Sequence, residues 1–139
     1  MPRYEYTQKN TWTGSSWTVN LDAGVGRNRS NLRDDVVIVQ FFLEALRPQW
    51  SGPQEVKRDG ICGPITTKAI LDFQNFLHSE FHVPIVRDSA VDPIKGVGSD
   101  IAYTLGWMHH LYIKTFRHNW PDLRYHAAWP RRAFPALYR

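Results

Sequence analysis

The sequence predicts a mainly α-helical protein: a compact three-helix bundle with an N-terminal β-hairpin and an irregular C-terminal arm. Three stretches carry apolar residues at three- and four-residue spacing, which is typical of helices. Ahead of them, aromatic and β-branched residues alternate with polar ones, as in strands. With 139 residues, 42% of them hydrophobic, the chain is long enough for one domain with a real core. We expect a hairpin and loop over 1–30, a helical domain over 31–116 and a basic, aromatic arm over 117–139.

The hairpin is predicted from YEYTQKNTWTGSSWTVNL, which spans residues 4–21 around a Gly-Ser-Ser turn. In this arrangement Trp12 and Trp17 are near enough to pair across the two strands. The following DAGVGRNRSN is interpreted as a plain loop, because a dinucleotide-binding fingerprint needs G-x-G-x-x-G and only Gly24 and Gly26 are present.

The first helix is expected over 32–46, with Ser30 or Asn31 as its cap and Asp34 and Asp35 in its first turn. It is apolar almost all round, so it should be the central helix. The second helix should begin at Pro64, and a third over 101–116 after a cap at Ser99 or Asp100. The buried stripe of the second helix is predicted to contain Ile65, Ala69, Phe73, Phe76 and Leu77.

The segments between the helices, 47–60 and 83–98, contain several Pro and Gly residues and are predicted to be loops. No internal repeat is recognised along the chain.

Two helical segments together resemble the three-helix type of bacterial peptidoglycan-binding domain. In that family a helix of the form D-V-x-x-x-Q-x-x-L is coupled to D-G-x-x-G-P-x-T-x-x-A-x-x-x-F-Q. The first pattern is matched by Asp35, Val36, Gln40 and Leu43. The second is matched by Asp59, Gly60, Gly63, Pro64, Thr66, Ala69, Phe73 and Gln74. AVDP at 90–93 also looks like the turn that opens the last helix in some members, so the resemblance covers about 31–116.

Physical chemistry accounts for most of this motif as fold specification. Asp59 and Gly60 favour a tight turn in which the carboxylate accepts backbone N–H bonds. Thr66 is expected to reach back to unpaired N–H groups of the helix. Gln40 and Gln74 are polar groups on apolar helix faces, so each should hydrogen-bond the backbone of a loop. Cys62 between the two glycines is expected to line the core.

The resemblance implies a non-catalytic module that binds peptidoglycan or its fragments and anchors a larger assembly at the cell wall. The expected binding surface lies near the DGICGP loop and consists of Trp50, Arg58, Asp59, Gly60, Thr66, Thr67 and Arg87. The alternative is a protein-interaction adaptor in a secretion, phage-tail or envelope complex, which uses the same scaffold. Its docking or self-association surface on the hairpin and arm would comprise Trp12, Trp17, Trp120, Trp129, Arg131, Arg132 and Phe134.

Charge and hydropathy make nucleic-acid and membrane-spanning functions unexpected. The net charge of +4 comes from the last 23 residues, where five arginines face Asp122 alone. A nucleic-acid-binding protein usually spreads such charge over one face. The longest apolar run, VVIVQFFLEAL, is too short to cross a bilayer. No signal peptide is recognised, so we expect a cytoplasmic chain before assembly, or export by a non-classical route to the periplasm or cell wall.

Catalysis has little support in the sequence, and we expect no metal and no cofactor. Cys62 before a helix is a conceivable nucleophile, but no histidine stands at the spacing of a known hydrolase. His78 and His82 are four residues apart without the glutamate placement of H-E-x-x-H. A small cell-wall hydrolase is therefore the second alternative only.

Overall fold

The computed structural model describes residues 3–6, 17–95 and 102–116. Over these residues the protein is mainly helical, with four helices and two small antiparallel two-stranded sheets. In chain order the elements are β1 (Arg3–Tyr6), β2 (Trp17–Asn20), β3 (Val25–Gly26), α1 (Arg33–Ala45), α2 (Arg47–Trp50), α3 (Pro64–Phe81), β4 (Ala90–Val91) and α4 (Thr104–Thr115).

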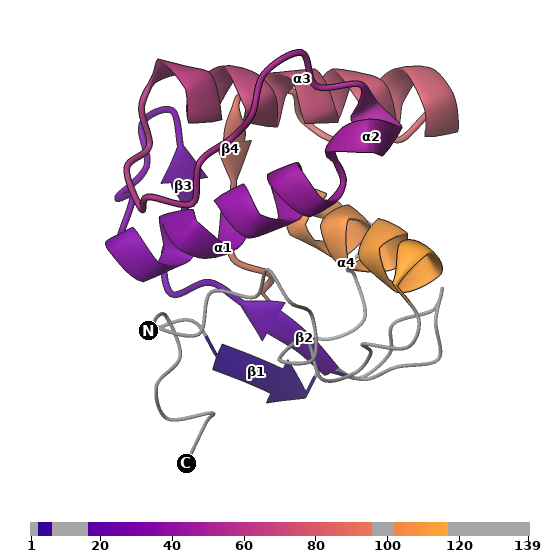
Figure 1. Cartoon of the computed structure of the whole chain (residues 1–139). Helices are drawn as coiled ribbons and strands as arrows, with labels where there is room; N and C mark the ends of the chain where they lie inside the picture. Colours follow the sequence, from indigo (N-terminus) through magenta and orange to yellow (C-terminus); the bar gives the residue numbers. More distant parts are fainter. Residues whose placement is uncertain (1–2, 7–16, 96–101, 117–139) are drawn as a thin grey trace.

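The helix α1 lies at the centre of the described structure and contacts both α3 and α4, as expected from its apolar sequence (Figure 1). Nine consecutive residues of α1, from Asp35 to Leu43, are buried. The core around α1 takes its largest fully buried side chains from α1, α3 and α4 and from the loops that flank α1. They are Leu21, Ile38, Phe41, Phe42, Leu43, Leu46, Ile70, Phe73, Leu77, Leu105 and Tyr112.

The start of α1 differs from the sequence prediction. Its N-cap is Leu32, and neither Ser30 nor Asn31 caps it. The side chain of Asn31 instead bonds to the N–H and C=O of Gly26. Asp35 is buried, and its two carboxylate oxygens accept hydrogen bonds from the backbone N–H groups of Asp22 and Ala23, which fixes the preceding loop to the helix.

The helix α3 begins at Pro64, as predicted, and ends where His82 adopts a left-handed conformation with φ of 53°. No side chain caps its first turn. The expected capping role of Thr66 is therefore wrong, because its hydroxyl faces α1 and accepts a hydrogen bond from Gln40. Ile65, which we expected in the buried stripe, is 47% exposed, since it lies on the side of the first turn that faces away from α1.

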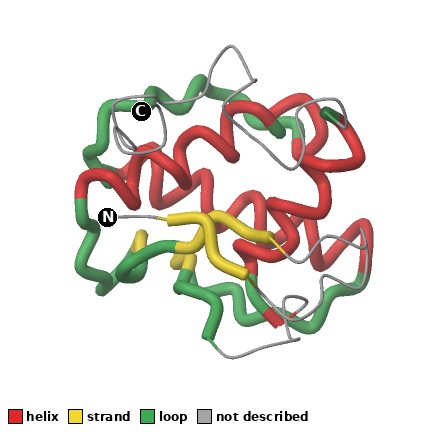
Figure 2. The backbone as a smooth tube through the Cα atoms, turned by 90° about the horizontal axis from the view of Figure 1, so that it is seen from below, coloured by secondary structure: helices red, strands yellow, loops and turns green. Residues whose placement is uncertain are grey.

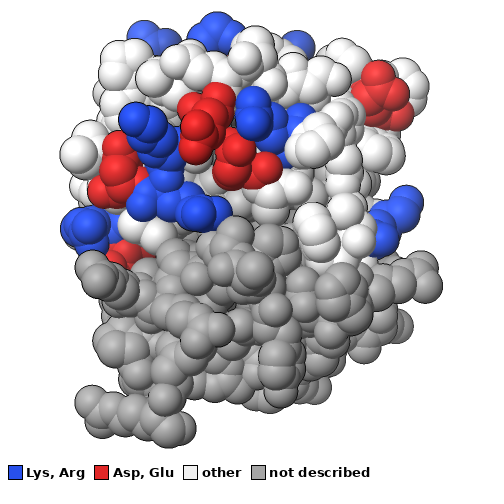
Figure 3. Space-filling model, in the orientation of Figure 1, with Lys and Arg blue, Asp and Glu red and all other residues white. Residues whose placement is uncertain are grey.

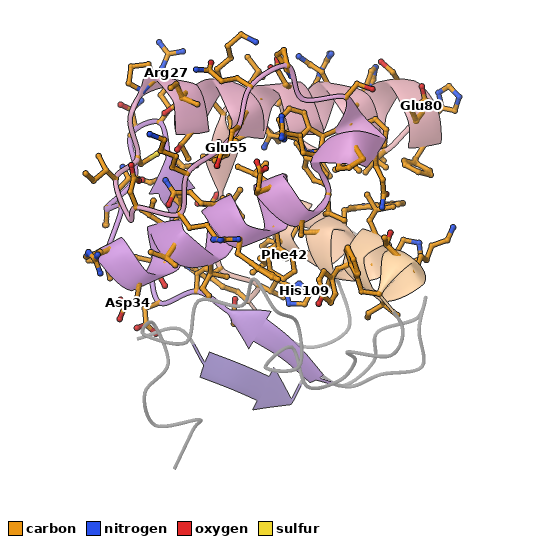
Figure 4. All side chains as sticks on the ribbon, viewed as in Figure 1. Arg27, Asp34, Phe42, Glu55, Glu80 and His109 are labelled. Carbon is orange, nitrogen blue, oxygen red and sulfur yellow. The ribbon has the colours of Figure 1, made fainter. Side chains whose placement is uncertain are left out.

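The helix α4 begins at Thr104, later than expected; the proposed caps Ser99 and Asp100 lie outside the described residues. His109 of α4 is fully buried and packs on the ring of Phe42, with ring centroids 4.9 Å apart (Figure 4). Its Nδ1–H donates to the carbonyl of Leu105 at 2.7 Å. Burial lowers the pKa of His109 to about 4, so the ring is neutral at physiological pH.

The predicted hairpin forms from β1 and β2 and lies across the helices when the molecule is seen from below (Figure 2). In its register Trp17 is opposite Tyr6, whereas Trp12, the expected partner, lies outside the described residues. Asn20 at the end of β2 exchanges two hydrogen bonds with the backbone of Ile94, at 2.8 and 2.9 Å. The hairpin strand is thus tied to the segment that precedes α4.

Three short elements lie in segments that we predicted to be loops. Residues 47–50 form α2, Val25–Gly26 form β3, and Ala90–Val91 form β4. The last two pair with each other, with Val25 opposite Val91 and Gly26 opposite Ala90. Gly26 has a φ of 118°, and a Cβ there would lie 2.1 Å from the carbonyl oxygen of Ser89, so this close approach requires glycine.

Candidate functional site

Gln40 of α1 holds the DGICGP loop against the helices. Its Nε2 donates to the carboxylate of Asp59, the carbonyl of Ile61 and the hydroxyl of Thr66, each at 3.0 Å. Its Oε1 accepts from the N–H of Gly60 at 2.9 Å. The carboxylate of Asp59 also accepts from the N–H of Ile61, which closes the predicted tight turn. We call residues 59–62 the Asp59 turn.

Gln74 of α3 makes the same set of contacts with a second loop. Its Nε2 donates to Asp88 at 3.3 Å, to the carbonyl of Ala90 at 2.9 Å and to the hydroxyl of Thr104 at 3.1 Å. Its Oε1 accepts from the N–H of Ser89, and Asp88 accepts from the N–H of Ala90. We call residues 88–91 the Asp88 turn. The expectation that both glutamines bond loop backbone is confirmed.

The two turns are copies of one structural unit, so the expectation of no internal repeat is wrong. Each unit has a helix with a buried glutamine, an Asp turn, and a threonine in the first turn of the helix that follows the Asp turn. Gly60 and Ser89 correspond and both have positive φ, 75° and 60°. The sequences RDGICGPI (58–65) and RDSAVDPI (87–94) share Arg, Asp, Pro and Ile. This short match is the signal that could have indicated the repeat from the sequence. It is difficult to recognise because Thr66 and Thr104 lie at different distances along the chain from their aspartates.

The Asp88 turn is covered by the segment that contains β3. In addition to the β3–β4 pairing, the N–H of Arg27 donates to the carbonyl of Ser89 at 3.1 Å. The guanidinium of Arg29 then binds Asp92 at 2.6 Å and Asp88 at 3.3 Å. Ser89, Ala90 and Val91 are consequently buried.

The Asp59 turn is open, and two adjoining hollows lie beside it. Ile61 is 68% exposed at this turn, and Ile65 lies next to it on α3. One hollow, of about 400 Å³, is lined by Trp50, Pro53, Gln54, Pro64, Ile65, Lys68, Ala69 and Asp72. The other, of about 590 Å³, is lined by Gln54, Glu55, Lys57, Asp59, Ile61, Gly63, Pro64, Ile65 and Thr66. Since they share Gln54, Pro64 and Ile65, we treat them as one groove, here called the turn groove.

Of the expected ligand residues, Trp50, Asp59 and Thr66 line the turn groove. Trp50 is only 6% exposed, and its Nε1 donates to the carbonyl of Leu43, so its ring belongs mainly to the core. Thr66 is 4% exposed, and its hydroxyl accepts a hydrogen bond from Gln40. The groove also contains residues that we had not expected, namely Pro53, Gln54, Glu55, Lys57 and Lys68.

The other expected ligand residues do not line the groove. Arg58 is exposed, Gly60 is half-buried in the turn, and Thr67 bonds to Gly63 within the first turn of α3. Arg87 belongs to the second unit, where it reaches Asn75 at 3.4 Å. Of the proposed docking residues, Trp17 lies in β2, whereas the side chains of Trp12, Trp120, Trp129, Arg131, Arg132 and Phe134 lie outside the described residues.

The charges around the turn groove are of both signs. The pKa of Asp59 is lowered, first by the N–H of Ile61 and then by the side chain of Gln40. Lys68 forms an ion pair with Asp72 at 2.6 Å, four residues along α3. On the face that carries Glu55, acidic and basic groups are interspersed over the described part of the surface (Figures 3 and 4). Such a surface suits a ligand with both charges better than a polyanion.

Cys62 is half-buried and packs against the core, and its Sγ lies 3.6 Å from the hydroxyl of Thr67. Within residues 3–6, 17–95 and 102–116, no three His, Cys, Asp or Glu side chains gather closely enough to hold a metal ion. The same part of the chain contains no helix both long and apolar enough to span a bilayer.

Comparison with known proteins gives no assignment: no family model, no curated protein and no solved structure matches this chain.

Proposed function

We propose that this protein is a non-catalytic module that binds peptidoglycan through the turn groove and so anchors a larger assembly at the bacterial cell wall. In this proposal α1, α3 and α4 are the three helices of a peptidoglycan-binding-like bundle. The protein would then act in the periplasm or facing the wall.

The observation that carries the proposal is the open groove beside the Asp59 turn. The residues of the D-G-x-x-G-P-x-T pattern form that turn and the start of α3. Four of them, Asp59, Gly63, Pro64 and Thr66, line the groove. Ile61 and Ile65 expose apolar surface there, at 68% and 47%. Exposed apolar side chains next to charged ones at a hollow are typical of a ligand site.

A catalytic function has less support from the same residues. In the described part of the chain the Cys62 thiol makes no hydrogen bond to a histidine, and its partner is the hydroxyl of Thr67 at 3.6 Å. A cysteine nucleophile needs a base within hydrogen-bond reach. We therefore infer that the groove holds its ligand without reacting with it.

Sedimentation with purified, insoluble peptidoglycan sacculi tests the proposal. We expect the wild-type protein in the pellet, and Ile61→Asp to remain in the supernatant because it places a charge on the apolar wall of the groove. Val86→Asp is the matched control, because Val86 is 73% exposed and lines neither hollow. Absence of the folded wild-type protein from the pellet would overturn the proposal and favour the adaptor interpretation.

A further inference from the structure

The covered Asp88 turn shows what the open Asp59 turn is built to accept. In the two copies Gly60 corresponds to Ser89, Ile61 to Ala90 and Cys62 to Val91. At the Asp88 turn these positions take up an extended segment: β3 pairs antiparallel with β4, and Arg27 donates to Ser89. Main-chain groups of one segment thus recognise main-chain groups of the other.

Among residues 3–6, 17–95 and 102–116, no such segment lies along the corresponding edge of the Asp59 turn. The side of this turn that faces α1 is occupied, because Gln40 bonds the N–H of Gly60 and the carbonyl of Ile61. Within the described residues, no hydrogen bond reaches the carbonyl of Gly60 or the backbone N–H and C=O of Cys62. These are the groups that correspond to the paired groups of Ser89 and Val91.

We infer that the Asp59 turn binds the peptide stem of peptidoglycan as a short added strand along 60–62, in the position that β3 occupies on β4. This inference rests on the proposed function and names the part of peptidoglycan that is recognised. A stem peptide is an extended chain of amides, so it offers the donors and acceptors that the edge requires.

The side chains around the groove favour the peptide over the glycan. Stem peptides carry carboxylate and amino groups, and the groove offers Lys57 and Lys68 together with Glu55 and Asp59. Sugar rings are usually held on flat aromatic faces. The aromatic residue among those that line the groove is Trp50, and only 6% of it is exposed.

Amide hydrogen exchange followed by NMR tests the mode of binding on the unmodified protein. The titrant is soluble stem peptide, released from sacculi by an amidase. We expect the N–H of Cys62 to exchange more slowly when the peptide is added, with shifted resonances for 60–62. The N–H of Val91 is the internal control, because it lies in the β3–β4 pair and should be protected throughout. Binding without slower exchange of Cys62 would overturn the added-strand arrangement.

A second experiment distinguishes a failure of this inference from a failure of the proposed function. Retention is measured on glycan strands whose stem peptides have been removed and which are immobilised on a resin, and we expect these strands not to retain the protein. If they retain it as well as intact sacculi do, the inference is wrong and the proposed function stands. If neither material retains it and the soluble peptide does not bind, both are wrong.

Two variants address the groups involved. Cys62→Pro removes the N–H donor and should weaken stem-peptide binding roughly tenfold, the equivalent of one well-placed hydrogen bond. Lys57→Glu reverses a charge in the groove and should weaken binding in a salt-dependent way. Lys114→Glu on α4 makes the same charge change outside the groove lining and should leave affinity unchanged. Unchanged affinity in folded Lys57→Glu would contradict the charge pairing.

Discussion

The Asp59 turn and the Asp88 turn have the same internal hydrogen bonds and different surroundings. In both, a buried glutamine donates to an aspartate, a carbonyl and a threonine, and accepts from the N–H of the residue with positive φ. At the Asp88 turn, β3 and Arg29 cover the outer side. At the Asp59 turn that side borders a groove. The comparison teaches that the same glutamine-centred hydrogen bonds fix the fold at both turns, whereas among the described residues the Asp59 turn is the one that leaves surface for a ligand.

Removing each glutamine should give the largest effects and should separate the two copies. Gln74→Leu leaves the N–H of Ser89 and the carbonyl of Ala90 without partners in a covered site, and each such group costs roughly 1–3 kcal/mol. We expect a loss of about 4 kcal/mol in the free energy of unfolding. Gln40→Leu should cost about 2 kcal/mol, because water reaches the open turn and replaces part of the bonding. Urea unfolding measures both, and equal losses would contradict the difference in covering.

The pH dependence of stability should be dominated by His109 of α4, the helix whose first residue, Thr104, bonds to Gln74 beside the covered Asp88 turn. Its pKa is about 4 in the folded protein against an ordinary value of 6.5. The unfolded chain therefore binds the proton first as pH falls, and stability is lost between pH 6.5 and about 4. The expected loss is roughly 3 kcal/mol, with no further change from this group below that range.

The control for this prediction is His109→Phe, which keeps a ring against Phe42 and removes the titration. Once the packing difference at neutral pH is subtracted, the unfolding free energies of the two proteins should coincide near neutral pH and diverge as the pH falls below 6.5, with the wild type becoming the less stable. His110 titrates in the same direction, since its pKa is also lowered by burial and by Lys114, and it is present in both proteins. Parallel pH profiles would show that His109 does not carry the effect.

Exchanging the residues with positive φ should give the smallest effects and the finest comparison. Gly60→Ser places a Cβ in a left-handed conformation 2.6 Å from Cγ of Arg33, a flexible side chain that can move. We expect a loss of about 1 kcal/mol, mainly from the backbone. Ser89→Gly should change stability by less than about 0.5 kcal/mol, because relief of strain is offset by a more flexible unfolded chain. Thermal unfolding of both single variants measures the pair, and a larger loss in Ser89→Gly would contradict the equivalence of the two positions.

Much of the fold was predictable because the relevant signals are local. The apolar periodicity placed α1 and α3, and Pro64 marked the start of α3 to the residue. A glutamine on an apolar helix face must bond something, so the roles of Gln40 and Gln74 followed from the sequence. The alternating pattern before residue 21 predicted the hairpin.

The missed features depend on residues far apart in the chain. The two-residue strands β3 and β4 carry no local sequence signal for a strand. They form because Val25 pairs with Val91, which lies 66 positions (91 − 25) further along the chain. Ile65 has the spacing of a core residue, yet the direction from which α1 approaches leaves it outside. The same packing makes Trp50 a core residue and brings Lys57 and Lys68 to one groove.

The sequence by itself determined the three longer helices, the hairpin and the polar residues that hold the turns, since each depends on neighbours within a few positions. Tertiary structure alone decided which of two equivalent turns is covered. Which turn is covered depends on where the 22–31 segment packs. Gly26 and Arg29 of this segment lie against the Asp88 turn and leave the Asp59 turn open. The location of the candidate site thus follows from long-range packing, although the residues of the turn itself are plain in the sequence.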